Sequence, residues 1–246
     1  MRQSLFFGIT LVLSLAVAQL IYSVFLPEHI KQGGPLVKLL IALSLLSLTF
    51  IIERYIALKK AEGRKNIHGF VKGFREDMEG GRVKEAVERC NQQGGSLANV
   101  LRSGLVSFQE AMDSDMTTYE KQDVTRRAIE EANALEAPLL ERNLIALSTI
   151  ASIATMVGLL GTTIGMIRSF KAMATTGAPD AIQLALGISE ALVNTAGGLS
   201  LAIVAIVAYN YFTARAEWFS HMIEETAFDV LETLGQRAER SHGRAA

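Results

Sequence analysis

The sequence has few of the residues that cross-link, kink or anchor small soluble domains. Its 246 residues include one cysteine, four prolines and one tryptophan. A single cysteine excludes a disulfide framework within the chain, so we expect Cys90 to be an ordinary thiol on a charged helix. The four histidines are scattered and lack metal-ligand spacing. We therefore expect no metal site and no cofactor.

Strong charge of one sign is absent as well. The formal net charge is −1, and no basic stripe with interleaved aromatic residues occurs, which argues against nucleic acid as a partner. We find no glycine-rich phosphate loop, nucleophile elbow or catalytic triad pattern. The chain is therefore not predicted to be an enzyme.

Charge is rare in four apolar segments, whereas the region between the second and third segments is rich in Glu, Lys and Arg. The segments are residues 4–26, 36–52, 143–167 and 182–212. The last two are each longer than the roughly 20 residues that a helix needs to cross a hydrocarbon core ~30 Å thick. Glu190 is the one acid inside them. Because a carboxylate at that depth is costly, Glu190 points to a polar pathway.

This alternation of apolar and charged blocks predicts an all-α membrane protein whose long transmembrane helices extend into a cytoplasmic helical region. Basic residues such as Arg54, Lys59 and Lys60 follow the second segment and place that end in the cytoplasm. Gly177 and Pro179 predict a tight outer turn between the last two spans. The domains expected are a hydrophobic segment 1–30, spans at 31–58, 142–170 and 181–213, a cytoplasmic region 59–141, and a cytoplasmic tail 214–246.

The first segment allows two interpretations. Arg2, the apolar run and the Ala16–Val17–Ala18 triplet are typical of a signal peptide cleaved before Gln19. The apolar run continues beyond that point, through Val24 and Phe25, which favours a retained extra span. We favour the retained helix, and both interpretations leave the second segment starting outside.

Small residues form continuous faces on the last two spans. Close helix packing is the ordinary explanation for glycines at such spacing, and we assign it to Gly158, Gly161, Gly165, Gly187 and Gly198. For Thr162 and Thr195, lining a pathway and bonding to their own helix remain open. A hairpin about Gly177 places Thr162 near the level of Glu190 and Thr195 some 7 Å deeper. Glu190 and Asn194 share one face, and Thr195 is turned roughly 140° from Glu190.

Two motifs in these spans resemble a known family. GLLGTTIGMIRSF (158–170), followed by GISEALVNTAGGLSLAIVAIVAYNYF (187–212), resembles the paired signature of the MotA/TolQ/ExbB proton channel family, with the ExbB branch as the nearest resemblance. Residues 53–61 and 135–162 extend the resemblance, which covers about 36–234. The segment 4–26 departs from the three-span pattern of that family.

The resemblance implies a homo-oligomer, a pentamer, in the bacterial inner membrane. The pentamer is expected to enclose the transmembrane helix of a smaller ExbD-like single-span partner. Together they are expected to use the proton motive force to drive a TonB-like protein. The resemblance also implies that Thr162, Thr195, Glu190 and Asn194 border the ion pathway, and that the proton-carrying aspartate belongs to the partner. Consistent with this, the last two spans contain no Asp. On this basis Thr162 and Thr195 line the lumen, and Glu190 tunes hydration or makes a polar interhelical contact.

Three alternatives stay open. Within the family, a TolQ-like role in an envelope-constriction motor is an alternative to the ExbB-like one. Hydroxyl-rich tracks suit Na⁺ as well as protons as the coupling ion. Outside it, a non-transporting helical scaffold would use the same polar residues only to hold helices together.

Overall fold

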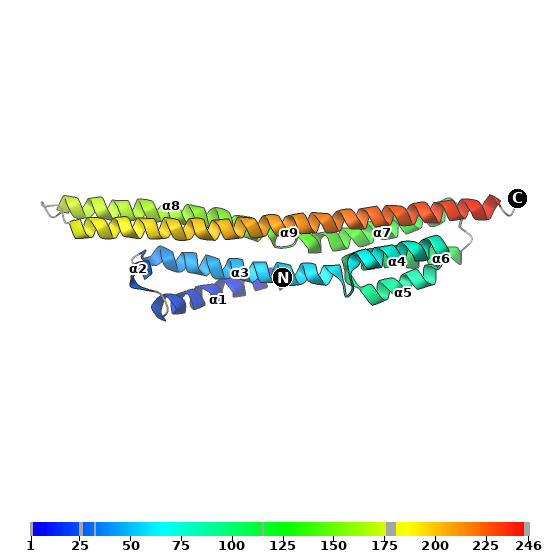
Figure 1. The fold of residues 1–246 in the computed structure, drawn as a ribbon, viewed down its shortest axis with the longest axis horizontal. Coiled ribbons are helices and arrows are strands. Elements are labelled where there is room, and N and C mark those ends of the chain that lie inside the picture. Colours follow the sequence, from blue (N-terminus) through cyan, green and yellow to red (C-terminus); the bar gives the residue numbers. More distant parts are fainter. Residues whose placement is uncertain (1, 25–26, 32, 115, 176–180, 244–246) are drawn as a thin grey trace. The chain divides into compact units, whose positions relative to one another are not determined.

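The computed structural model describes residues 2–24, 27–31, 33–114, 116–175 and 181–243, and all secondary structure in these ranges is helical (Figure 1). The chain forms two compact units, residues 1–54 with 143–212 and residues 55–142 with 213–246. The helices are α1 (Arg2–Val24), α2 (Glu28–Lys31), α3 (Pro35–Glu62), α4 (Ile67–Gly80), α5 (Val83–Gln93), α6 (Gly95–Met112), α7 (Thr118–Glu141), α8 (Leu144–Thr175) and α9 (Ala181–Gly243).

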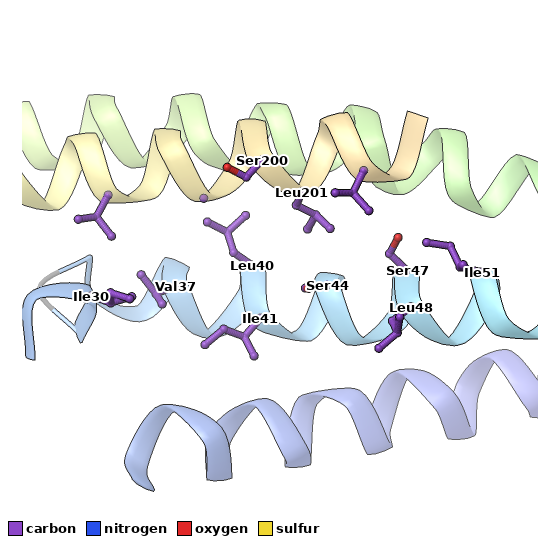
Figure 2. Close-up of a pocket in the computed structure, with 13 residues that line it drawn as sticks. Ile30, Val37, Leu40, Ile41, Ser44, Ser47, Leu48, Ile51, Ser200 and Leu201 are labelled. Carbon is purple, nitrogen blue, oxygen red and sulfur yellow. The ribbon is translucent and has the colours of Figure 1, made fainter. Parts of the chain in front are cut away.

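The first unit holds the apolar helices. Among the described residues, three helical stretches are long and apolar enough to cross a membrane, by length and composition alone: Pro35–Gly80, Thr118–Lys171 and Ala181–Gly235. They include α3, most of α8 and most of α9. Residues Gly8–Val24 of α1 form a shorter apolar helix. Figures 1 and 2 show α1 beside α3, and Lys38 Nζ of α3 lies 4.6 Å from the Tyr22 ring centroid. The predicted turn residues Gly177 and Pro179 lie outside the described residues.

Helices α8 and α9 run antiparallel and touch along faces built from small residues. A Cβ atom at Gly158 would lie 3.3 Å from the Asn194 carbonyl oxygen, and one at Gly165 would lie 2.6 Å from the Gly187 carbonyl oxygen. A side chain at Gly165 would therefore collide with the backbone of α9, and one at Gly158 would be crowded against it. Five buried glycines lie on this contact: Gly158, Gly161, Gly165, Gly187 and Gly198.

The second unit is a set of shorter helices with capped ends. Gly81 ends α4 in the left-handed conformation, with φ 77° and backbone bonds to Asp77 and Met78. Thr117 starts α7 with a capping box closed by Glu120. Both boundaries carry local sequence signals, a glycine after the last turn of α4 and a threonine followed three residues later by glutamate at the start of α7. Aromatic and aliphatic side chains from several helices fill the core, among them Phe70, Phe74, Leu97, Leu101 and Phe219.

One helix break falls elsewhere than expected. The proline rule predicts a kink or reset at Pro138, but α7 continues through Pro138 to Glu141. The interruption lies at Asn143, whose φ is 62°. The Asn143 side chain donates from Nδ2 to Glu53 Oε2 at 3.2 Å. Asparagine tolerates the left-handed region better than most residues, and its side-chain bond to Glu53 of α3 accompanies the break before α8.

Two adjacent glycines allow a matched test of the α8–α9 contact. A Cβ at Gly198 would lie 2.6 Å from the Ala154 carbonyl oxygen, whereas one at Gly197 meets only the end of Leu40 at 3.3 Å. We expect Gly198→Ala to lower the free energy of unfolding by about 1–3 kcal/mol through overpacking. Gly197→Ala should be neutral or slightly stabilising, since alanine favours helix by up to ~1 kcal/mol. Thermal unfolding in detergent measures both, and equal effects would contradict the contact.

Cys90 should be chemically inert in the folded protein. It is 2% exposed, and burial raises the pKa of its thiol to about 12, despite the nearby charges of Arg102 and Arg89. Because the thiolate is the reactive species, we expect slow maleimide labelling at pH 8 and fast labelling after denaturation. Mass spectrometry of timed reactions measures this. Fast labelling of the folded chain would show that the second unit opens readily.

Candidate functional site

The acid of the fourth segment is paired. Arg168 of α8 approaches Glu190 of α9 through one guanidinium nitrogen, Nη1, at 2.5 Å from Oε1 and 2.7 Å from Oε2. Glu190 is 7% exposed, while the Arg168 side chain is 53% exposed. The apolar segment inferred from the sequence stops at residue 167, yet α8 continues to Thr175 and brings this cation opposite the acid. Glu190 is therefore a neutralised carboxylate at the contact of two helices.

The turn before α3 closes over this ion pair. Gly34 has a φ of 70°, and a Cβ there would lie 2.7 Å from Glu190 Oε1. Asn194 is fully buried and donates from Nδ2 to the Gly33 carbonyl at 2.8 Å and to the Glu190 carbonyl at 3.0 Å. Glu190 and Asn194 thus share a face, and that face holds the turn in place. Their immediate partners are protein atoms.

Thr195 and Thr162 lie on the other side of the helix pair. Thr195 donates from Oγ1 to the Gly158 carbonyl of α8 at 3.1 Å, and Thr162 donates to the Leu159 carbonyl of its own helix at 2.7 Å. Both side chains are half-buried. Each hydroxyl proton is therefore engaged, while each oxygen keeps a lone pair that can accept another hydrogen bond.

Helical geometry relates these positions to each other. The line of α8 that faces α9 runs along Ala154, Gly158, Gly161 and Gly165. The matching line of α9 runs along Gly187, Ala191, Asn194 and Gly198. At 100° per residue, Thr162 and Thr195 are each turned about 70° from these lines in the same rotational sense. Because the helices are antiparallel, both point to one side of the pair. Glu190 is turned about 70° the other way.

The register also sets their levels. Gly161 is opposite Asn194, and Gly165 is opposite Gly187 and Ala191. Thr162 is therefore level with residues near 193, which puts it about 4.5 Å further from the hairpin turn than Glu190 and about 3 Å nearer than Thr195. Thr162 is thus nearer in level to Thr195 than to Glu190. The two threonines form one pair of acceptors on one side, and the ion pair occupies the other.

A metal is not suggested by the described side chains. Among residues whose placement the structure gives, no group of three or more His, Cys, Asp and Glu could hold an ion. The second unit does carry a compact charged cluster, in which Asp77 accepts from Arg89 at 2.7 Å and from Arg82 at 3.0 Å. Burial would raise the pKa of Asp77, but these arginines together hold its pKa below the usual value. The cluster stabilises the turn between α4 and α5.

Sequence comparisons show what this chain is similar to. The chain is 31% identical over 183 residues to the Tol-Pal system protein TolQ of Pseudomonas aeruginosa, covering 72% of this chain and 77% of that protein. It is 32% identical over 185 residues to the putative biopolymer transport protein ExbB-like 3 of Synechocystis sp., covering 73% and 81%. It is 34% identical over 152 residues to the biopolymer transport protein ExbB of Pseudomonas putida, covering 61% and 45%.

The family match falls on the helices that carry the site. It covers residues 95–225, which include α6, α7, α8 and most of α9, with both threonines and the ion pair. Similarity to relatives named TolQ and to relatives named ExbB leaves the branch unresolved. This chain belongs to the MotA/TolQ/ExbB proton channel family.

Proposed function

We propose that this chain is the wall-forming subunit of a proton-driven motor in the bacterial inner membrane. It would act with an ExbD-like single-span partner to energise TonB-dependent transport across the outer membrane. The observation that carries the proposal is the separation of polar groups on the α8–α9 pair. Thr162 and Thr195 lie on one side, whereas Glu190 is neutralised by Arg168 on the other.

In this proposal the threonine side of the pair borders the lumen of a homo-oligomer, a pentamer in the family resemblance. A ring of hydroxyl groups can accept a hydrogen bond from a protonated carboxyl and donate to an ionised one. The partner's carboxylate would cross this ring in both states. Moving one charge across the membrane releases ~2.3 kcal/mol per 100 mV, which is enough to bias the packing of helices in a ring. The chain's C-terminus would lie in the cytoplasm.

A TolQ-like role is the second candidate, and a specific observation supports it. The relative from Pseudomonas aeruginosa named TolQ matches over 77% of its length. Both roles would use the same threonine hydroxyls to border the ion pathway, so the site does not distinguish them. Neighbouring genes would: an ExbD-like gene beside TonB favours transport, and a Tol–Pal cluster favours envelope constriction. Ion flux measured with sodium and with a proton gradient alone would assign the coupling ion.

Replacing the lumen hydroxyls should stop coupling without disturbing assembly. Thr162→Val and Thr195→Val keep the side-chain shape and remove the hydroxyl. We expect each to lower receptor-dependent uptake about tenfold or more, because one hydrogen bond to a desolvated acid is worth ~1–3 kcal/mol. Thr49→Val is the matched control for Thr162→Val, since Thr49 of α3 also bonds its own helix, at 2.9 Å.

The threonine experiment needs two further readouts. Size-exclusion chromatography should give the same assembly for all variants, and Thr162→Ser should restore most uptake. Full activity of both valine variants would refute the lumen assignment and favour a scaffold in which the hydroxyls only join helices.

Glu190 should behave as half of a structural pair. Arg168→Ala leaves a buried carboxylate unpaired, so we expect the free energy of unfolding to fall by about 1–3 kcal/mol. Breaking a fully buried pair costs ~3–5 kcal/mol, and the cost is smaller here because Arg168 is half-exposed. Adding Glu190→Gln to Arg168→Ala should recover much of that loss. Thermal unfolding and uptake are measured on both single variants and the double. A stable double variant without uptake would instead make Glu190 a proton carrier.

A further inference from the structure

An open groove runs between α3 and α9 within the first unit (Figure 2). It has a volume of about 490 Å³. Its walls are mostly aliphatic, from residues such as Val37, Leu40, Ile51 and Val204. Three serines interrupt this lining: Ser44 and Ser47 of α3 and Ser200 of α9. Helix α1 lies on the side of α3 away from α9 (Figure 2).

These three hydroxyls differ from the others in this unit. The described threonines and serines elsewhere in it make hydrogen bonds or other polar contacts, mostly to carbonyls of their own helix, as at Thr49, Ser152 and Thr162. Within the described residues, Ser44, Ser47 and Ser200 have no hydrogen-bond partner; Ser44 and Ser200 are exposed, whereas Ser47 is buried, with 1% of its surface exposed. Figure 2 shows Ser47 pointing from α3 toward α9. A hydroxyl aimed into an apolar groove calls for a partner from outside the chain.

The depth of the groove restricts what that partner can be. The bond between Asn143 and Glu53 sets α8 and α3 level at one end. Ser47 and Ser44 then lie about 9 and 13.5 Å along α3 from Glu53, inside a hydrocarbon core ~30 Å thick. Lipid headgroups and esters do not reach that depth, and acyl chains offer no acceptor. A transmembrane helix with polar side chains at this level both reaches that depth and offers hydrogen-bond acceptors.

The chain itself carries such a surface. The face of α8 that points away from α9 exposes Thr149, Ser152 and Met156. Thr149 and Ser152 are six and nine residues from Asn143, so they lie at the levels of Ser47 and Ser44. Their hydroxyls donate to the carbonyls of Ile145 and Ser148, at 2.8 and 3.1 Å. Their oxygens remain free to accept, whereas the groove serines have protons to donate.

We infer that the groove of one copy receives the outer face of α8 from a second copy of this chain. Copies related by rotation about the membrane normal keep every residue at its own depth, so hydroxyls that match in level within one chain also match between neighbours. The contact joins two different surfaces, and repeated around an axis it closes a ring. It leaves the threonine side of α8 and α9 facing away from the groove. The inference rests on the proposed homo-oligomer and names its interface.

Cysteine cross-linking with adjacent, level-matched positions tests this contact. Ser200 lines the groove, whereas neighbouring Leu199 is 46% exposed on another face of α9. Each is changed to cysteine together with Met156→Cys, in a Cys90→Ala background and in native membranes. Within one chain, residues 156 and 200 lie on opposite outer sides of the helix pair, so a disulfide between them joins two chains. We expect a ladder of linked copies from Ser200→Cys and unlinked chains from Leu199→Cys.

Removing the three serine hydroxyls gives a second measurement. The triple variant Ser44→Ala, Ser47→Ala and Ser200→Ala should dissociate at lower detergent concentration than the unchanged protein, with Thr49→Ala as control. Native mass spectrometry gives the number of copies and any retained lipid. An oligomer that links equally well through Leu199→Cys, or that holds a lipid or another protein's helix in the groove without Ser200 links, overturns this interface alone. A monomeric chain would overturn the proposed homo-oligomer as well.

Discussion

The close approach of α8 and α9 determines where every other functional group lies. Glycine carbonyls and Cα atoms of the two helices meet without intervening side chains, as at Gly158 and Gly198. This contact fixes both the register and the rotation of each helix. Once Gly161 is opposite Asn194, the levels and directions of Thr162, Thr195 and Glu190 follow from helical geometry.

The ion pair shows how an apolar helix can keep an acid whose charge is balanced by a cation of the neighbouring helix. Arg168 neutralises Glu190, and Asn194 joins the same face to the turn at Gly33. Gly34 is required there because a Cβ would collide with the carboxylate. The ion pair and Asn194 together therefore connect α8, α9 and the turn before α3. The half-exposed guanidinium of Arg168 offsets the cost of desolvating the buried acid, which explains how Glu190 is tolerated in an apolar helix.

Much of this could be predicted from sequence, because it depends on local patterns. Apolar length predicts the long helices, Gly81 and Thr117 predict helix ends, and a 100° step separates the directions of Glu190 and Thr195. What could not be predicted depends on contacts between distant segments. The partner of Glu190 is 22 residues away across a hairpin, and Gly33 is 161 residues from Asn194. The break at Asn143, rather than Pro138, likewise depends on Glu53 of another helix.

Helix α9 carries different kinds of contact residues on different faces. One line of small residues packs against α8, one flank carries Thr195, and the opposite flank carries Glu190 and continues into the serine-lined groove. Hydroxyl groups lie on both flanks of α9, but they differ in their hydrogen-bond partners. Thr195 donates to a neighbouring helix of its own chain, while Ser200 has no partner among the described residues. In hydrocarbon an unpartnered hydroxyl favours association, and a partnered one keeps only its acceptor. In the proposed oligomer, the same residue chemistry would therefore support a polar lumen on one side and assembly on the other.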